Sequence, residues 1–404
     1  MENKQPRLHK NLVAAVFEAL ETSFGKGYYA DKVIERILKS NPKWGARDRA
    51  FIAETTYEIV RWWRYLWELY GKSPSLKRKE LDRIFGLWWR LQGYELPEWH
   101  GFEAVRDIDI KAAKKSLPND VGVQQSFPIW FDELAHEDLG KDWPEIAKNL
   151  NIPAEVTLRT NTLKTNRNEL KSILKAEDVP TTEFPLNDIG LTLKERKNAF
   201  KNPSFQKGLF EVQDGGSQLI APFLRVEPGM RVVDACAGAG GKTLHLAAIM
   251  NNKGSIIAMD VEQRKLNELK KRAKRNSVHN IEIRHIDGSK SIKRLKGSAD
   301  RLLLDVPCSG TGVIKRNPDT KWKIQPEHLD RVMAIQKNIL NDYSQMLKSG
   351  GMMVYATCSI LHAENENQVK DFLEHRDDFK LIEDKRVNPS KHTDGFYMAL
   401  FQKI

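Results

Sequence analysis

Apolar side chains recur at helical spacing along the first third of the chain. One such run is Leu12, Val13, Val16, Phe17, Leu20 and Phe24, and another is Phe51, Ile52, Ile59, Trp62, Trp63 and Leu66. Residues three or four positions apart share one face of a helix, so the pattern predicts helices over 11–24 and 47–70. Strand-like alternation is scarce before residue 150. We therefore predict an all-helical domain over 1–150.

Nine of the ten tryptophans lie in this region, between Trp44 and Trp143, and the tenth is Trp322. We expect most of them to pack the helical core, with stacking on nucleic-acid bases as the alternative. Pro144 and the stretch Asn151-Ile152-Pro153 then break the helical pattern, which indicates a domain boundary. Residues 151–208 are predicted to form a small mixed α/β segment, with a strand at 156–159 and a helix at 166–176.

The pattern changes again in the remainder of the chain, over 209–404. Short apolar runs that predict strands lie at 231–235, 255–259, 281–285, 301–305 and 352–356. Helical patterns alternate with them at 242–250, 261–275, 327–348 and 363–374. This alternation is typical of a doubly wound parallel sheet. Ligands of such sheets bind at the carboxyl ends of the strands.

Composition narrows the class of protein. The 404 residues carry 65 Lys and Arg against 54 Asp and Glu, a net charge of +11, which favours a polyanionic partner such as RNA or DNA. The three cysteines are too far apart for a disulfide framework or a CxxC zinc site, so we expect no metal. The sequence contains no long apolar run of the kind that indicates a membrane span or a signal peptide. We expect a cytoplasmic protein.

A glycine-rich loop follows the first strand of the predicted sheet, with the sequence DACAGAGGKT over 234–243. A phosphate-binding P-loop would need a glycine where Cys236 stands, and a dinucleotide fingerprint would need Gly or Ala in place of Thr243. Both patterns fit less well than a class I S-adenosylmethionine site. In such a site, Asp260 at the end of the second strand would accept hydrogen bonds from the ribose hydroxyls. Asp287, after the third strand, would meet the adenine amine, or it is a turn aspartate.

Two cysteines follow neighbouring strands of the same sheet. Cys308 stands three residues after Asp305, and Cys358 follows the fifth strand directly. A buried, inert role is common for one cysteine, but two at one sheet edge suit a particular chemistry. A thiolate that adds to carbon-6 of cytosine makes carbon-5 nucleophilic enough to accept a methyl group. Such a thiolate requires a lowered cysteine pKa.

These motifs resemble the Sun/RsmB-type RNA cytosine-5 methyltransferases. The resemblance rests on 236–243, 303–312, Arg316-Asn317-Pro318-Asp319 with Lys321-Trp322, Gly350-Gly351, 355–359, Glu364-Asn365, 394–397, 158–164 and 213–218. Residues 47–52 resemble the NusB-like RNA-binding domain of the bacterial branch. The resemblance implies a Rossmann-like class I methyltransferase domain preceded by a NusB-like domain and the small α/β segment.

The resemblance also implies roles for particular residues. Cys358 would be the nucleophile, Cys308 would assist release of the methylated base, and Asp305 would lie between cofactor and cytosine. The cofactor S-adenosylmethionine would be held by Cys236, Ala237, Gly238, Ala239, Gly240, Gly241, Lys242, Asp260, Asp287 and Asp305. One departure concerns the cofactor loop, where the family usually has Ala-Pro-Gly-Gly and this chain has Gly238-Ala239-Gly240-Gly241. Without the proline we expect a looser loop.

The expected activity is methylation of carbon-5 of a cytosine in small-subunit (16S) rRNA, either free or in an assembling subunit, by a monomer without membrane association. The target base must leave its stack to reach the cysteines. Two alternatives stay open: the same chemistry on tRNA, and a catalytically silent RNA-binding assembly factor. DNA methylation fits less well. Cytosine-5 DNA enzymes place the nucleophile in a Pro-Cys motif, whereas this chain has a Thr-Cys motif (Thr357-Cys358) besides Pro307-Cys308.

Overall fold

The computed structural model describes residues 7–195 and 198–404, and the chain divides into two compact units. The first contains the chain up to Asn151 together with Arg316–Ile324, and the second contains Ile152–Lys315 and Gln325–Ile404. Within the described residues, no helix is long and apolar enough to cross a membrane.

The first unit is helical in its described part. Its helices are α1 (Lys10–Leu20), α2 (Ala30–Ser40), α3 (Ala46–Arg61), α4 (Trp63–Tyr70), α5 (Arg78–Leu91), α6 (Glu103–Arg106), α7 (Ile110–Ser116), α8 (Val121–Gln124), α9 (Ile129–Leu139) and α10 (Trp143–Asn151). The helix predicted over 47–70 is divided at Trp62, whose backbone leaves the helical region. Trp63, Trp67, Trp88 and Trp89 are buried in one cluster, which confirms the core role expected for them.

Residues 316–324 fold as part of this helical unit, although they lie far along the chain from it. Lys321, on the short helix α17 (Thr320–Lys323), is 2% exposed and donates hydrogen bonds to the Asn151 Oδ1 at 2.7 Å and the Gln125 carbonyl at 3.0 Å. The indole N–H of Trp322 donates to the Val60 carbonyl at 2.7 Å. A contiguous unit over 209–404 was predicted without this excursion, because its contacts are made with residues hundreds of positions away.

A four-stranded antiparallel sheet opens the second unit, in the order β2-β3-β1-β4. Its strands are β1 (Thr157–Thr160), β2 (Thr181–Glu183), β3 (Gly190–Leu193) and β4 (Phe210–Val212). The helix α11 (Arg167–Ala176) packs on it through Leu170 and Leu174. The predicted strand at 156–159 and helix at 166–176 are present. The other three strands have only three or four residues, too few to show a period in the sequence.

The rest of the second unit is a seven-stranded sheet in the order β10-β11-β9-β8-β5-β6-β7. Strands β5 (Arg231–Asp234), β6 (Ser255–Asp260), β7 (Ile281–His285), β8 (Ala299–Asp305) and β9 (Leu347–Thr357) are parallel and are the five predicted strands. Strands β10 (Phe379–Val387) and β11 (Phe396–Lys403) add an antiparallel edge that was not predicted. The sheet confirms the class I methyltransferase fold expected from the sequence.

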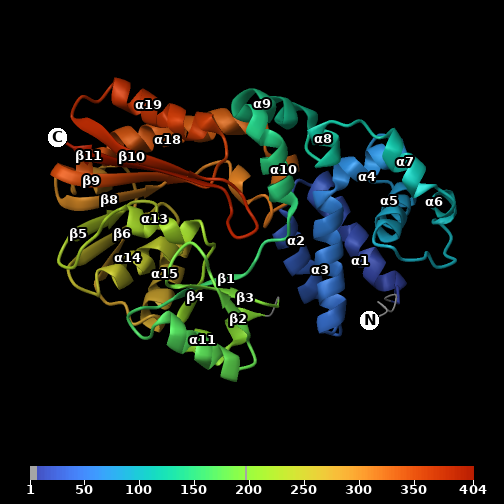
Figure 1. Cartoon of the computed structure of the whole chain (residues 1–404), viewed down its shortest axis with the longest axis horizontal. Helices are drawn as coiled ribbons and strands as arrows, with labels where there is room; N and C mark the ends of the chain where they lie inside the picture. Colours follow the sequence, from blue (N-terminus) through green and yellow to red (C-terminus); the bar gives the residue numbers. More distant parts are fainter. Residues whose placement is uncertain (1–6, 196–197) are drawn as a thin grey trace. The chain divides into compact units, whose positions relative to one another are not determined.

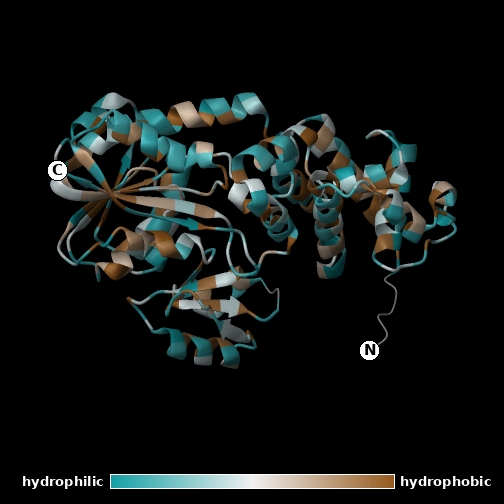
Figure 2. Cartoon of the chain, turned by 45° about the horizontal axis from the view of Figure 1, so that its top comes forward, coloured by the Kyte–Doolittle hydropathy of each residue, from teal (hydrophilic) through white to brown (hydrophobic). Residues whose placement is uncertain are grey.

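Alternate strand residues face two helical layers. Val232 and Leu303 pack with α14 (Gly241–Ile249) and α15 (Gln263–Arg275), whereas Val233 packs with α18 (Pro326–Tyr343) and α19 (Glu366–Glu374). Figure 1 shows these helix pairs on opposite faces of the sheet. The strands are hydrophobic and the outer helix faces polar in Figure 2, as a sheet covered on both faces requires.

The segment 316–324 gives a stability prediction. Lys321→Met removes the donor shared by several buried acceptors, and unsatisfied buried groups cost about 1–3 kcal/mol each, so we expect the first unit to lose at least ~2 kcal/mol of unfolding free energy. Urea unfolding followed by tryptophan fluorescence measures this unit selectively, since all ten tryptophans belong to it. The control is Lys323→Met, because Lys323 is half-exposed and donates to the Ser23 carbonyl. Equal midpoints for the two variants would contradict the anchoring role of Lys321.

Candidate active site

The glycine-rich loop between β5 and α14 is held by its own backbone and by β6. The Ala237 N–H donates to the Met259 carbonyl at 2.9 Å, and the Gly238 N–H donates to Asp260 Oδ2 at 2.8 Å. Gly240 has a φ of +87°, and a Cβ at this position would lie 2.6 Å from Leu269 Cγ. Glycine is therefore required where the chain turns into α14.

A cavity of about 600 Å³ lies beside this loop. Of the residues predicted for the site, those that line it are Cys236, Gly238, Asp260 and Asp305. Helix α18 supplies one wall, which sequence reasoning missed, with Ile335, Asn338, Ile339, Asp342 and Tyr343. The one signal for that wall in the sequence is Ile335, an apolar residue on an otherwise polar helix face, and it is 45% exposed.

The two predicted ribose and adenine contacts differ in their position. Asp260 is buried at the end of β6, lines the cavity, and accepts backbone N–H groups from Gly238 and Glu262. Asp287 does not line the cavity. Its exposed carboxylate accepts the Ser291 hydroxyl at 2.5 Å, and that hydrogen bond lowers the Asp287 pKa. This local hydrogen bond fits the turn-aspartate alternative.

Cys308 and Cys358 meet as expected. Their sulfur atoms are 3.2 Å apart, and the Cys358 N–H points to the Cys308 sulfur at 3.3 Å. Both are free cysteines. The hydrogen bond with Cys358, and burial, raise the pKa of Cys308 well above its ordinary value. Cys308 is therefore a protonated thiol at neutral pH, and the lowered pKa expected of a nucleophile does not apply to it.

An ion pair lies close to the two sulfurs. The Lys242 ammonium is 2.5 Å from Asp305 Oδ2, and the lysine side chain is only 13% exposed. Burial alone would lower the Lys242 pKa, but Asp305 and then Cys358 outweigh it and the net pKa is raised. Lys242 therefore stays cationic at neutral pH. Its burial also shows that Lys242 is not a surface lysine.

A buried carboxylate joins the two cysteine loops. Glu364 is fully buried and accepts hydrogen bonds from the hydroxyls of Ser309 and Ser359, each at 2.5 Å. It also accepts the Ser309 N–H at 2.8 Å and the Gln336 amide at 2.9 Å. These two serines directly follow the two cysteines. The sequence predicts no role for Glu364 beyond its place in a motif, because its partners Ser309 and Ser359 lie in loops that follow two different strands.

Comparison with known proteins identifies the family. A family model described as 16S rRNA methyltransferase RsmB/F matches residues 221–402, and a ferredoxin-like domain model of RsmF/B-like methyltransferases matches 127–199. The chain is 30% identical to a probable ribosomal RNA small subunit methyltransferase B of Synechocystis, over 93% of this chain and 95% of that one. The chain belongs to the RsmB/F family.

Other relatives agree with this assignment. The ribosomal RNA small subunit methyltransferase B of Vibrio vulnificus is 32% identical over 88% of this chain and 92% of that protein. A methyltransferase homologue from Pyrococcus horikoshii has a solved structure that matches with a TM-score of 0.63 and 27% identity, covering 70% of this chain and 97% of that one. RsmB/F proteins are S-adenosylmethionine-dependent RNA methyltransferases, so the resemblance and the cofactor class expected from the sequence are confirmed.

The sulfur geometry of this RsmB/F chain gives a prediction independent of activity. Diamide, which accepts two electrons and two protons, should join Cys308 and Cys358 in a disulfide, because their sulfurs are already 3.2 Å apart. Cys236 should stay reduced, since a disulfide needs a second sulfur within reach and the described sulfur–sulfur contact joins Cys308 and Cys358. Mass spectrometry of tryptic peptides locates the bond. A Cys236→Ser variant should crosslink equally, and a disulfide that includes Cys236 would contradict the geometry.

Proposed function

We propose that this RsmB/F chain transfers the methyl group of S-adenosylmethionine to carbon-5 of a cytosine in small-subunit rRNA. The observation that carries the proposal is the pair of sulfurs 3.2 Å apart at neighbouring strand ends. Methyl transfer to nitrogen or oxygen needs no thiol, whereas carbon-5 of cytosine needs a nucleophile on carbon-6. The names of the relatives support ribosomal RNA of the small subunit as the substrate.

The cavity fits the proposed cofactor. Its volume lies within the range of small-molecule sites, and Asp260 stands at the end of the second parallel strand, where a carboxylate can accept ribose hydroxyls. Val261, Ile286 and Ile339 give it an apolar lining that suits an adenine ring. When bound, S-adenosylmethionine supplies an electrophilic methyl group on a sulfonium. Asp305 belongs both to this lining and to the ion pair beside the cysteines.

Cys358 is the proposed nucleophile. Its thiolate forms a bond to carbon-6, and the π electrons of the C5=C6 bond move to make carbon-5 nucleophilic toward the methyl group. Once carbon-5 has formed its bond to the methyl group, with S-adenosylhomocysteine as the leaving group, it loses its proton to water. The double bond re-forms, and Cys358 leaves with the electrons of the S–C6 bond. The Lys242 ammonium stabilises the thiolate before attack and after release, while Asp305 holds that ammonium and accepts a hydrogen bond from the base's amine.

Cys308 has the complementary role of assisting release. Its raised pKa keeps its proton in place, so its S–H can donate a hydrogen bond to the departing sulfur of Cys358. That hydrogen bond stabilises the thiolate as the S–C6 bond breaks. Glu364 is proposed as a positioning residue, because it fixes the serines that follow both cysteines.

The RNA must be held elsewhere on the chain. We propose that the region 1–150, as a NusB-like domain, and the segment 151–208 bind the RNA around the target base. The net charge of +11 supports attraction of a polyanion. We further propose that the enzyme acts as a monomer on a base that has left its stack. The intact set of Cys308, Cys358, Asp305 and Lys242 argues against a catalytically silent factor.

The reaction is tested by the two cysteine variants. With S-adenosylmethionine and 16S rRNA, Cys308→Ala should accumulate a covalent protein–RNA adduct that survives denaturing electrophoresis, because release is slowed. Cys358→Ala should form no adduct and show at least ~10³-fold less turnover, as for loss of a nucleophile. The methylated product should be 5-methylcytosine by mass spectrometry of nucleosides.

Parallel reactions with small subunits and with tRNA separate the substrate alternatives. An adduct on tRNA alone would overturn the rRNA assignment and leave the chemistry intact. Turnover of Cys358→Ala near the wild-type rate would overturn the nucleophile assignment. Binding of S-adenosylhomocysteine with no methylation of any of these RNAs would favour the silent assembly factor.

The cofactor site gives a second prediction. Asp260→Ala should weaken binding of S-adenosylhomocysteine by about tenfold or more, since hydrogen bonds to a charged group contribute ~1.5–3 kcal/mol. Isothermal titration calorimetry measures this without RNA. Asp287→Ala is the control, and its dissociation constant should stay within about twofold of wild type, because Asp287 does not line the cavity. An unchanged constant for Asp260→Ala would contradict the proposed ribose contact.

A further inference from the structure

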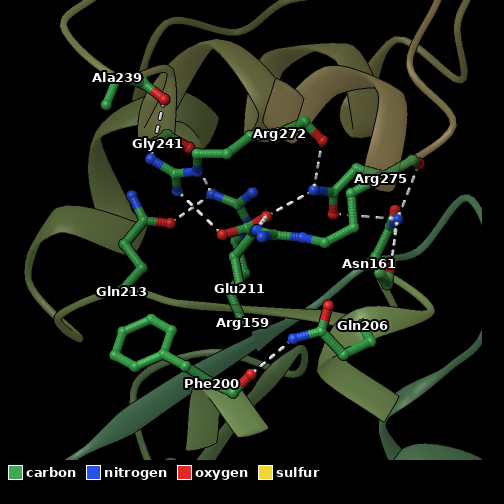
Figure 3. A network of polar contacts seen from close by, with 12 residues as sticks. Arg159, Asn161, Phe200, Gln206, Glu211, Gln213, Ala239, Gly241, Arg272 and Arg275 are labelled. Carbon is green, nitrogen blue, oxygen red and sulfur yellow. Dashed lines mark hydrogen bonds and ion pairs between the residues drawn. The ribbon is translucent and has the colours of Figure 1, made fainter. Parts of the chain in front are cut away.

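Side chains of the antiparallel sheet reach the cofactor loop from outside the cavity. Arg159, on β1, is 3% exposed. Its Nη1 donates to the Gly241 carbonyl at 2.7 Å and also to Gln213 Oε1 (Figure 3). Because a carbonyl and the next nitrogen share one rigid peptide plane, fixing the Gly241 carbonyl also fixes the backbone of Lys242.

A second arginine holds the other side of the same turn. Arg272, on α15, donates from Nη1 to the Ala239 carbonyl at 2.8 Å. Its Nη2 donates to Glu211 Oε2 at 2.9 Å (Figure 3). The two arginines therefore bind the carbonyls on either side of Gly240, the residue with positive φ that directly precedes α14.

Glu211, on β4, is the counterion of this cluster. It is 3% exposed, and its Oε1 accepts the Asn276 amide at 2.5 Å and also pairs with Arg275. Burial would raise the Glu211 pKa, but Arg272 and Arg275 outweigh it and the net pKa is lowered. Burial lowers the Arg159 pKa to about 9, so Arg159 stays cationic at neutral pH. In the folded protein at neutral pH, Arg159 is therefore cationic and Glu211 is anionic.

Burying these charges costs free energy that apolar side chains of similar size would not. None of these charged side chains lines the cavity. They bind the cofactor loop, in which Ala239 stands where the family usually has a proline. The N–H groups of residues 237 and 240 donate to backbone carbonyls and that of Gly238 donates to Asp260 Oδ2, while the arginines bind the carbonyls of residues 239 and 241. The loop is therefore constrained at each of five successive residues.

We propose that Arg159 and Arg272, with Glu211 as their shared counterion, are positioning residues that hold the loop 237–241 in the conformation that binds the cofactor. The antiparallel sheet thus contributes to cofactor affinity without touching the cofactor. This inference rests on the proposed function, because it takes the cavity beside the loop as the cofactor site. The constraint comes from tertiary contacts where a proline would have supplied it locally.

The test compares two arginines of one helix. Arg272 and Arg275 both pair with Glu211, but the described loop contact belongs to Arg272, whereas Arg275 lies 3.9 Å over the Phe205 ring. Arg272→Met should raise the dissociation constant for S-adenosylhomocysteine about tenfold, and Arg275→Met less than about threefold. Calorimetry on the full chain gives both values, and thermal unfolding checks that both variants are folded.

Steady-state kinetics add a second readout. Arg272→Met should raise the KM for S-adenosylmethionine about tenfold with kcat within about threefold, and Arg272→Lys should restore part of the affinity by donating to one of the two acceptors. Arg159→Met should act in the same direction as Arg272→Met. Equal effects of Arg272→Met and Arg275→Met, or an unchanged affinity in Arg272→Met, would overturn the inference. Failure of the wild-type chain to bind S-adenosylhomocysteine would instead overturn the proposed function.

Discussion

The parallel pairing of β8 with β9 is the constraint on which the site depends. Asp305 is paired in register with Ala356, so the loops that follow the two strands leave the sheet side by side. This pairing brings Cys308 and Cys358, 50 residues apart in the sequence, to a sulfur–sulfur distance of 3.2 Å. It also sets Asp305 at the sheet edge where Lys242 arrives from the neighbouring loop. A shift of register by one residue would turn these side chains to the opposite face.

Buried carboxylates hold the loops that the sheet leaves free. Glu364 accepts hydrogen bonds from both cysteine loops, and Glu211 is the counterion of the arginines that bind the cofactor loop. A buried charge is tolerated only when donors surround it, and each of these two groups has at least three. Because all the donors must be in place together, such a network favours one loop conformation over its alternatives.

In the helical unit, the short segment 316–324 packs with residues that are far from it in the sequence. In the sequence, Lys321 lies between strands of the sheet, yet its Nζ donates hydrogen bonds to acceptors of the first unit. Asp319 in the same segment accepts the Ala30 N–H at 2.8 Å. The chain therefore passes between the two units more than once.

The sequence by itself determined the five parallel strands, the helices between them and the placement of both cysteines at strand ends, because period, length and glycine turns are local signals. It also indicated Asp260 and the glycine at position 240. Only the tertiary structure decided that Asp287 is not part of the cavity lining, that Lys242 pairs with Asp305, and that 316–324 joins the helices. The contacts of Arg159, Glu211 and Glu364 could not be predicted either. Each of these side chains binds partners on separate elements, and such contacts leave no pattern in the local sequence.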